Sequence, residues 1–437
     1  MQSYEALPAR ALAGSMTVPG DKSISHRALM LAGIAEGRSE VSGFLPSADC
    51  LASMRAMRAL GVPIEQPRPT HVVIDGAGMH GLRRPAAALD LGNAGTAMRL
   101  FTGLLCAQQF DSLLIGDSSL MRRPMERVAA PLRAMGADVR TIGGTPPVQI
   151  VGGRRLRPIE YRMPVASAQV KSAILLAGLY AGGASTVISP AVSRDHSERM
   201  LRSFGVRVET DDLTVRVHPP ARLAAQRLQI PGDFSSAAFF IVAALLAADD
   251  RGLLIENVGV NPSRIGLLEI LRRMGGGIEL LNPRASGSEP VADLRVRRST
   301  LRGIEVPAAF VPLAIDELPV LFVAAACAHG ETLISGAEEL RVKESDRIAA
   351  MGAGFAALGV AHTVLADGMR IGGGGDGAAF GGGEVDSCGD HRVAMSFAVA
   401  SLRARAPIRI RDVANVATSF PDFVALARSV GFDVRES

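Results

Sequence analysis

The chain has 437 residues, of which 48% are hydrophobic and 4% aromatic, and its formal net charge is +4. This length exceeds one ordinary core, so two or more domains are expected, and the few aromatic residues without a Lys or Arg block argue against a nucleic-acid-binding protein. The longest apolar run, 237–248, is too short to cross a bilayer, and the first residues do not resemble a signal peptide. Because the four cysteines lack paired spacing for metal or disulfides, we expect a cytoplasmic protein.

A pattern of helices, glycines and strands recurs six times along the chain. Each copy opens at a residue that can cap a helix N-terminus, continues through an apolar helix and a strand, and closes with a helix that ends at a glycine suited to positive φ. In chain order the helix starts are Asp21, Asn93, Ser167, Asp233, Asp316 and Asp390, the strands are 39–44, 112–116, 185–189, 253–258, 332–335 and 408–413, and the glycines are Gly61, Gly136, Gly205, Gly275, Gly359 and Gly431.

The six copies predict two domains of three copies each. The segment Pro19-Gly20-Asp21 has a counterpart in Pro231-Gly232-Asp233, which indicates a domain boundary near Pro231. We therefore expect one domain over 19–230 and a second that includes 231–437.

Cationic side chains lie at or near several of these helix starts. Helix N-termini present free N–H groups and a positive dipole end, which favour phosphate and carboxylate groups, and Arg or Lys side chains strengthen such sites. The pattern indicates a site for anions. Its candidate residues are Lys22, Ser23, Arg27, Arg99, Arg123, Lys343, Glu344, Arg347 and Arg392.

Lysine is rare in this chain, because only Lys22, Lys171 and Lys343 are lysines among 47 basic residues. Lysine carries a compact ammonium that can lose its proton, whereas arginine carries a permanently charged fork. We therefore expect the three lysines to include residues with a task that arginine cannot perform.

Simpler interpretations stay open for several of these residues. Arg99 could cap a helix or pair locally, Asp316 could serve only as an N-cap, and Glu344 with Arg347 could form a surface pair at i,i+3 spacing. A glycine-rich phosphate loop is not needed to explain any of them.

Taken together, these segments resemble the 5-enolpyruvylshikimate-3-phosphate synthase family over nearly the whole chain. The segments around Ser167 and Ser193 resemble its class II branch. The matching segments are PGDKSISHRA (19–28), LGNAGTAMR (91–99), RP (123–124), SAQ (167–169), RVKESDR (341–347), GDHR (389–392) and SFPD (419–422).

The resemblance implies a two-domain inside-out α/β fold with six βαβαββ repeats, three per domain. Residues 1–18 would join 231–437 in one domain, 19–230 would form the other, and the active site would lie in the interdomain cleft. The implied enzyme is a monomer without metal or organic cofactor, and it binds neither nucleic acid nor membranes.

The implied reaction transfers the carboxyvinyl group of phosphoenolpyruvate to the 5-hydroxyl of shikimate 3-phosphate by addition and elimination, and it releases phosphate. It is the sixth step of the shikimate pathway to chorismate and the aromatic amino acids. Two phosphate monoesters and two carboxylates bring roughly −5 to −6 charges to the site, which suits the many cations.

The family's motifs assign roles to individual residues here. Asp316 would take the proton of the 5-hydroxyl, and Lys22 or Glu344 would protonate the methylene carbon. The residues implied to bind shikimate 3-phosphate are Lys22, Ser23, Arg27, Ser167, Gln169, Asp316 and Lys343, and those implied to bind phosphoenolpyruvate are Lys22, Gly95, Arg123, Gln169, Arg347 and Arg392.

The chain departs from the family's common pattern at three positions. Ala168 stands where many members have a second serine, Thr418 where class I members have a lysine, and Leu100 where many members have a proline. Although Gly95 is retained, Leu100 together with the segments that resemble the class II branch favours reduced sensitivity to the inhibitor glyphosate.

Two other functions remain as alternatives. The sister enzyme UDP-N-acetylglucosamine enolpyruvyl transferase uses a cysteine in a basic loop as its acid, and none of Cys50, Cys106, Cys327 and Cys388 lies in such a loop. A non-catalytic protein that binds phosphate or RNA ends on a repeat scaffold would explain the cations but not the acidic pair Asp316 and Glu344.

Overall fold

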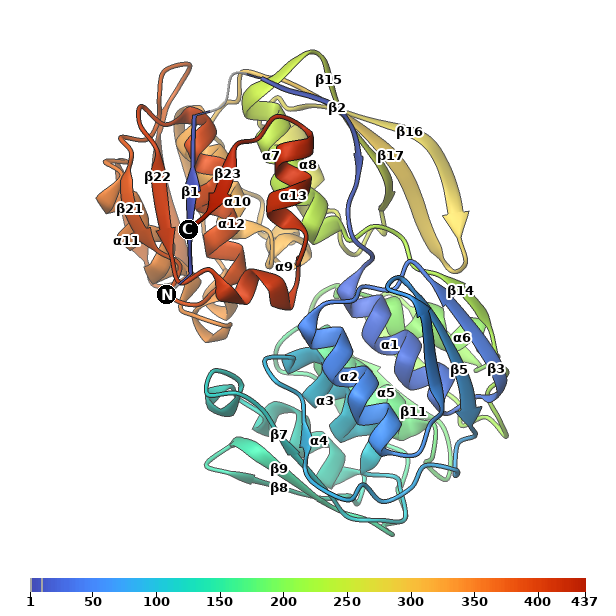
Figure 1. Cartoon of the computed structure of the whole chain (residues 1–437). Coiled ribbons are helices and arrows are strands. Elements are labelled where there is room, and N and C mark those ends of the chain that lie inside the picture. Colours follow the sequence, from blue (N-terminus) through green and yellow to red (C-terminus); the bar gives the residue numbers. More distant parts are fainter. Residues whose placement is uncertain (1, 9–10) are drawn as a thin grey trace. The chain divides into compact units, whose positions relative to one another are not determined.

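The computed structural model describes residues 2–8 and 11–437, which are drawn in Figure 1. The chain divides into two units: the first comprises Met1–Pro19, Pro231–Ala285 and Pro290–Ser437, and the second comprises Gly20–Ile230 and Ser286–Glu289. The repeat pattern did not indicate that 286–289 pack with the second unit. Residues 1, 9 and 10 of the expected segment 1–18 lie outside the described residues.

The second unit contains three four-stranded sheets with the same pairing pattern. In each sheet an edge strand pairs in parallel with the second strand. The second strand pairs antiparallel with the third, and the third and fourth strands form an antiparallel hairpin. In spatial order the sheets are β14 (Arg227–Gln229), β3 (Glu36–Ser42), β5 (His71–Ala77), β4 (Ile64–Arg68); β6 (Leu89–Asp90), β7 (Ser112–Ile115), β9 (Thr145–Val151), β8 (Asp138–Ile142); and β10 (Glu160–Arg162), β11 (Ser185–Ile188), β13 (Thr214–Val217), β12 (Val208–Asp211).

The first unit repeats this design and uses the beginning of the chain to complete it. Strand β2 pairs in parallel with β15, and β1 pairs antiparallel with β22. Parallel bridges from Arg302 and Glu305 run along β18, where a fourth strand would pair. The sheets are β16 (Gly277–Ser286), β17 (Glu289–Arg297), β15 (Ala248–Gly259), β2 (Leu12–Thr17); β18 (His329–Ile334), β20 (Gly368–Gly374), β19 (His362–Leu365); and β21 (Gly383–Asp386), β22 (Ile408–Arg411), β1 (Ser3–Ala6), β23 (Val434–Glu436).

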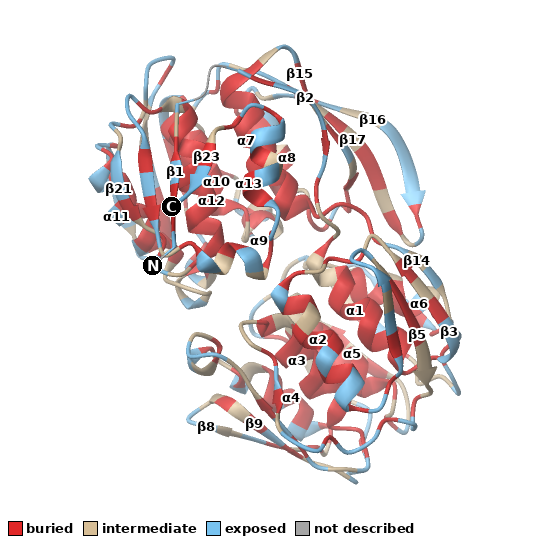
Figure 2. Ribbon diagram, in the orientation of Figure 1, coloured by how far each residue is buried: buried red, intermediate tan, exposed pale blue. Residues whose placement is uncertain are grey.

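Apolar helices fill the interior of each unit. Every residue of α7 (Phe234–Ala247), α10 (Leu318–Ala326) and α12 (His391–Ala400) is buried, and these helices pack against one another, as Figure 2 shows. A helix that is hydrophobic on all sides is stable only when it is covered on all sides. The remaining helices are α8 (Gly266–Arg273), α9 (Val311–Ala314), α11 (Arg347–Ala357) and α13 (Phe423–Ser429) in the first unit, and α1 (Lys22–Gly33), α2 (Ala48–Ala59), α3 (Gly95–Leu105), α4 (Glu126–Ala134), α5 (Ala168–Gly178) and α6 (His196–Ser203) in the second.

Most of the predicted local signals are confirmed. A strand lies at each of the six predicted places, and the six glycines have φ between 75° and 99°. The carboxylates of Asp21, Asp233 and Asp390 and the hydroxyl of Ser167 accept hydrogen bonds at their helix starts. At the other two predicted helix starts, Asn93 and Asp316, the structure differs from the prediction.

The capping predictions for Asn93 and Asp316 are wrong. Helix α3 begins after Ala94, and α10 begins after Glu317, so both predicted residues lie outside the capping position. Both side chains are engaged elsewhere, in the two groups of polar residues described below.

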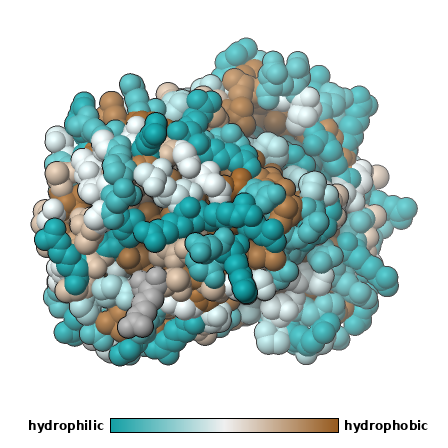
Figure 3. Space-filling view, turned by 90° about the horizontal axis from the view of Figure 1, so that it is seen from above, coloured by the Kyte–Doolittle hydropathy of each residue, from teal (hydrophilic) through white to brown (hydrophobic). Residues whose placement is uncertain are grey.

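Among the described residues, no helix combines the length and the apolar sequence that a bilayer crossing needs. The face in Figure 3 is mostly hydrophilic and is interrupted by separate hydrophobic patches. The exposed large hydrophobic residues come from different elements and are Leu113, Ile142, Val165, Val192, Val342 and Val364.

Candidate active site

The start of α1 in the second unit carries two cations five residues apart, Lys22 and Arg27. Asp21 caps the helix by accepting a hydrogen bond from the Ile24 amide at 2.8 Å. Lys22 Nζ lies 3.0 Å from Asp49 Oδ2 in a largely buried ion pair. The carbonyl of Ser23 accepts a hydrogen bond of 2.9 Å from Arg27. The helix start therefore holds both cations in defined positions, as the motif predicted.

Arg27 joins α1 to α5 and α6. Its guanidinium donates to Ser197 Oγ at 2.7 Å and to Ser172 Oγ at 2.8 Å, and only 4% of the residue is exposed. Burial lowers the pKa of Arg27 to about 10, although Glu198 and Asp21 act in the opposite direction. A buried guanidinium bonded to hydroxyl and carbonyl oxygens is well suited to bind an anion.

The starts of α3 and α5 are linked through Gln169. Its amide oxygen accepts a hydrogen bond from Arg99 at 2.9 Å, and its amide nitrogen donates to Thr96 Oγ1 at 2.8 Å. Arg99 also donates to the carbonyl of Gly95 at 3.2 Å. Arg99 is thus a structural link between the helices, in line with the simpler interpretation, whereas Ser167 caps α5 through the Val170 amide.

Arg123 lies beside Gly95. It follows the short helix η1 (Leu120–Arg122) and donates to the carbonyl of Asn93 and to Ser119 Oγ, both at 3.2 Å. A Cβ atom on Gly95 would lie 2.9 Å from Arg99 Nη1 and 3.0 Å from Arg123 Nη1. The missing side chain therefore allows two guanidinium groups to approach the start of α3 closely.

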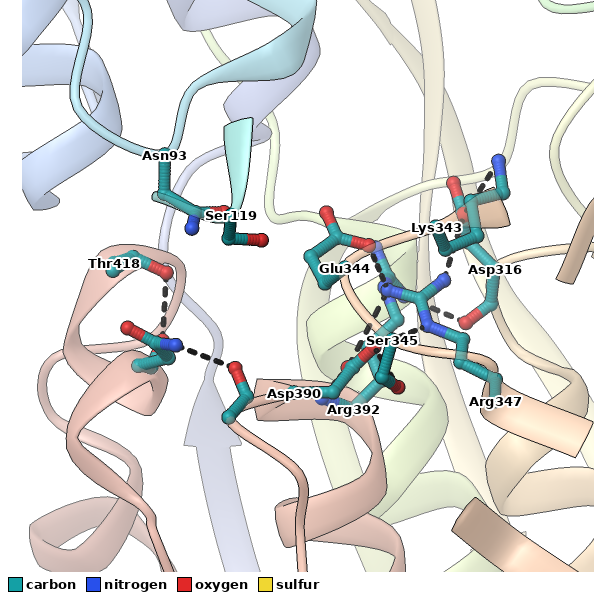
Figure 4. Close-up of polar contacts among 12 residues, drawn as sticks. Asn93, Ser119, Asp316, Lys343, Glu344, Ser345, Arg347, Asp390, Arg392 and Thr418 are labelled. Carbon is teal, nitrogen blue, oxygen red and sulfur yellow. Dashed lines mark hydrogen bonds and ion pairs between the residues drawn. The ribbon is translucent and has the colours of Figure 1, made fainter. Parts of the chain in front are cut away.

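In the first unit three carboxylates surround the guanidinium of Arg347, as Figure 4 shows. The distances are 2.7 Å from Nε to Asp390, 2.6 Å from Nη2 to Glu344 and 3.3 Å from Nη1 to Asp316. Burial lowers the pKa of Arg347, but the carboxylates of Asp390 and Glu344 outweigh it and raise the pKa above its ordinary value. Glu344 and Arg347 are therefore no simple surface pair.

Lys343 lies beside one of these carboxylates, that of Asp316. Its Nζ is 3.6 Å from Asp316 Oδ1 and 3.9 Å from Glu339 Oε1. Burial lowers the pKa of Lys343, against the effect of both carboxylates. The expectation that Lys343 lies at a helix start is wrong, because it follows the 3-10 helix η3 (Glu338–Val342), and α11 begins only at Arg347.

Arg392, in the first turn of α12, connects this group to α10. It donates to the carbonyl of Asp316 at 2.9 Å and lies 3.7 Å from Glu317 Oε1. Glu317 in turn contacts the hydroxyl of Ser235 at the start of α7 and lies 3.8 Å from Arg264. The N-terminal ends of α7, α10, α11 and α12 are thus linked by side chains.

The predicted site residues form one group in each unit. Lys22, Ser23, Arg27, Gly95, Arg123, Ser167 and Gln169 lie in the second unit, whereas Asp316, Lys343, Glu344, Arg347 and Arg392 lie in the first. Apart from the capping predictions for Asn93 and Asp390, the sequence indicated no role for the residues that orient them, which are Asp49, Asn93, Ser172, Ser197, Glu317 and Asp390.

The two groups contain the elements for binding anions and for moving protons. Lysine and carboxylate groups can exchange protons, and the arginines can neutralise phosphate or carboxylate charges. Within residues 2–8 and 11–437, no cluster of three His, Cys, Asp or Glu residues could hold a metal ion.

The fold matches that of enolpyruvyl transferases. The enolpyruvyl transferase NikO from Streptomyces tendae has a TM-score of 0.81 at 19% identity, with 100% of this chain and 99% of that chain covered. EPSP synthase from Acinetobacter baumannii has a TM-score of 0.89 at 50% identity, with both chains covered completely. The inside-out α/β fold expected from the motifs is thereby confirmed.

Sequence comparison identifies the family within this class. The 3-phosphoshikimate 1-carboxyvinyltransferase of Methylococcus capsulatus is 57% identical over 99% of this chain and 98% of its own length, and that of Legionella pneumophila strain Lens is 53% identical over both complete chains. The model of the EPSP synthase (3-phosphoshikimate 1-carboxyvinyltransferase) family matches residues 7–426. The chain belongs to the EPSP synthase family.

Proposed function

We propose that the two groups of residues bind the two anionic substrates of the family's reaction, shikimate 3-phosphate and phosphoenolpyruvate. The observation that carries this proposal is Arg27, a buried cation whose hydrogen bonds go to neutral oxygens. A bound phosphate or carboxylate would compensate its charge. One reaction consumes both substrates, so the proposal requires the two groups of residues to act together in that reaction.

In this proposal each substrate is assigned residues from both units. Shikimate 3-phosphate contacts the cations at the start of α1 and the polar start of α5, and phosphoenolpyruvate contacts the arginines beside Gly95 and at the starts of α11 and α12. The full assignments are Lys22, Ser23, Arg27, Ser167, Gln169, Asp316 and Lys343 for shikimate 3-phosphate, and Lys22, Gly95, Arg123, Gln169, Arg347 and Arg392 for phosphoenolpyruvate.

The proposed chemistry is an addition followed by an elimination. Asp316 removes the proton from the attacking 5-hydroxyl, while Lys22 or Glu344 delivers a proton to the methylene carbon of phosphoenolpyruvate. The resulting tetrahedral adduct loses a proton and expels phosphate. Lys343 Nζ, 3.6 Å from Asp316 Oδ1, supports this role because a nearby cation keeps the carboxyl group in the ionised form, which is the form that can accept a proton.

Binding of phosphoenolpyruvate to Arg347 requires a change of partners. Three carboxylates already contact this guanidinium, and Glu344 is the most exposed of them. We propose that Glu344 leaves Arg347 when the substrate carboxylate arrives. The release would free Glu344 for proton transfer at the methylene carbon.

The sister activity toward UDP-N-acetylglucosamine is disfavoured by the cysteines. Cys50, Cys106 and Cys327 are buried. Burial and the carboxylates of Asp386 and Asp412 raise the pKa of the exposed Cys388, so its surroundings are the opposite of a basic loop.

Release of phosphate tests the assignment. The protein is mixed with phosphoenolpyruvate and either shikimate 3-phosphate or UDP-N-acetylglucosamine, and inorganic phosphate is measured. We expect release only with shikimate 3-phosphate. Release only with the nucleotide sugar, or none with either acceptor, would refute the proposed function.

We further propose that the enzyme is a cytoplasmic monomer with reduced sensitivity to glyphosate. The free state of all four cysteines supports a reducing compartment. Light scattering during gel filtration tests the monomer. Tight competition between glyphosate and phosphoenolpyruvate in an inhibition assay would contradict the reduced sensitivity.

A further inference from the structure

Arg27 is surrounded by buried carboxylates that do not bind it. In the described part of the chain no ion pair joins Arg27 to a carboxylate, yet Glu198, Asp21 and Glu289 all act on it electrostatically. Glu198 is 1% exposed and Glu289 is 4% exposed. A buried carboxylate that was free to move would be expected to pair with the nearest buried guanidinium.

Each of these carboxylates is held by another group. Asp21 caps α1 through the Ile24 amide, and Glu289 Oε1 lies 2.8 Å from His196 Nδ1. Glu198 Oε1 lies 2.6 Å from Lys171 Nζ, and this ion pair is almost completely buried. Lys171 is therefore the cation that forms an ion pair with Glu198.

The position of Lys171 is tied to that of Arg27 through neighbouring residues. Lys171 precedes Ser172 on α5, and Glu198 follows Ser197 on α6. The hydroxyls of Ser172 and Ser197 lie 2.7 Å apart, and both accept hydrogen bonds from Arg27. The lysine–glutamate pair and the serine pair thus form two adjacent links between the same helices.

Lys171 also donates a hydrogen bond of 3.3 Å to the carbonyl of Ser193, in the segment that leads into α6. A compact ammonium with three donors can bind Glu198 and this carbonyl together. An arginine carries its charge on a longer side chain that ends in a planar fork. This is a task for which lysine is better suited than arginine.

We propose that Lys171 is a positioning residue of the shikimate 3-phosphate site: by holding Glu198, it keeps the charge of Arg27 available to the anionic substrate. The inference rests on the proposed role of Arg27. Without Lys171, the carboxylate of Glu198 competes with the substrate for Arg27, and α6 loses the link that sets Ser197. The contribution of Lys171 is therefore conditional on the charge of Glu198.

Three variants test this dependence: Lys171→Met, Glu198→Gln and the double variant. Calorimetric titration measures the dissociation constant of shikimate 3-phosphate, and steady-state kinetics measures KM for each substrate. K171M should weaken shikimate 3-phosphate binding at least about tenfold, because an unpaired buried charge is strongly unfavourable and competes for Arg27. KM for phosphoenolpyruvate should change much less.

The double variant distinguishes charge competition from a packing defect. Removal of both charges should restore the dissociation constant to within about threefold of the unsubstituted protein, since neither an unpaired charge nor a competitor remains. E198Q alone should bind shikimate 3-phosphate equally well or more tightly. If K171M is too unstable to assay, binding in the double variant that is at least tenfold weaker than in E198Q would still refute the inference, and equal binding in these two variants would support it.

Arg27→Gln separates this inference from the proposed site. Unchanged shikimate 3-phosphate binding in R27Q would refute the role of Arg27. If R27Q weakens binding while K171M binds normally, or while the double variant remains at least tenfold weakened, the role of Lys171 is refuted and the site stands. Glu126→Gln, in the exposed Glu126–Arg133 pair, is the matched control and should leave binding unchanged.

Discussion

Arg347 Nε lies 2.7 Å from Asp390 Oδ2, and the two side chains are 1% and 0% exposed. The same aspartate accepts a hydrogen bond from the Arg392 amide at 2.8 Å and thereby caps α12. One carboxylate therefore fixes both the guanidinium at the start of α11 and the backbone that carries Arg392. Loss of its charge should affect stability and substrate binding together.

Asp390→Asn should be strongly destabilising. The substitution keeps a side chain that can cap α12 but leaves the buried Arg347 without its most deeply buried carboxylate, which costs about 3–5 kcal/mol of unfolding free energy. Urea unfolding measures the loss. Asp386→Asn, in the exposed pair with Arg411, is the control and should cost less than about 1 kcal/mol. Equal stability of the two variants would contradict this account of Asp390.

Lys22→Arg should retain binding and lose turnover. Arginine can still pair with Asp49 and keep the positive charge at the start of α1, but it does not give up its proton. We expect kcat to fall about a hundredfold or more while both KM values change only a few-fold. Steady-state kinetics with each substrate varied in turn measures the difference.

Lys22→Met is the companion variant for this test. It removes the charge as well as the proton, so it should raise KM for both substrates in addition to lowering kcat. A turnover number near that of the unsubstituted enzyme in Lys22→Arg would exclude Lys22 as a proton donor. It would leave Glu344 as the candidate.

Gly95→Ala should impair phosphoenolpyruvate binding selectively. The new methyl group would lie about 3 Å from the guanidinium groups of Arg99 and Arg123, closer than real Cβ contacts allow, so the arginines must move. We expect KM for phosphoenolpyruvate to rise about tenfold or more, in line with the loss of one charge-assisted contact. KM for shikimate 3-phosphate should rise less.

Gly182→Ala serves as the matched control for this substitution. A Cβ atom at Gly182 meets nothing within 4 Å. The control should leave both KM values unchanged. If Gly95→Ala raised KM for shikimate 3-phosphate more than KM for phosphoenolpyruvate, the assignment of Gly95 to phosphoenolpyruvate binding would be contradicted.

The sequence predicted the features that depend on short segments. The glycines after helices, the strands and the caps of Asp21 or Asp233 each follow from a few adjacent residues, because capping and positive φ are local requirements. The motifs also indicated residues that the structure brings together within each unit, such as Arg347 with Asp316.

The partners of those residues could not be predicted in the same way. The i,i+3 spacing in the sequence suggested Glu344 as a neighbour of Arg347, and the two do form an ion pair, although Glu344 precedes α11. The contacts of Arg27 with Ser197, and of Lys171 with Glu198, join different helices and depend on how α1, α5 and α6 pack. Lys171 could therefore be singled out by composition, but its task required the structure.

His26 should make the protein sensitive to acid. Its Nδ1 lies 2.7 Å from Ser53 Oγ in the interior of the second unit, and burial, with smaller effects of Lys22 and Arg27, lowers the pKa of His26 to about 3. In the unfolded chain the imidazole takes up a proton near pH 6.5. Between these values the unfolded state binds more protons, so stability is present above pH 6.5 and is lost as the pH falls.

A comparison of His26→Asn with the unsubstituted protein isolates this contribution. From pH 7 to pH 5 the protonation of one such histidine removes about 2 kcal/mol of unfolding free energy. Urea unfolding at the two pH values should give a decline that is smaller by this amount in His26→Asn. His80→Asn, at an exposed imidazole, should show the same decline as the unsubstituted protein. An identical decline in all three proteins would mean that His26 is protonated in the folded state.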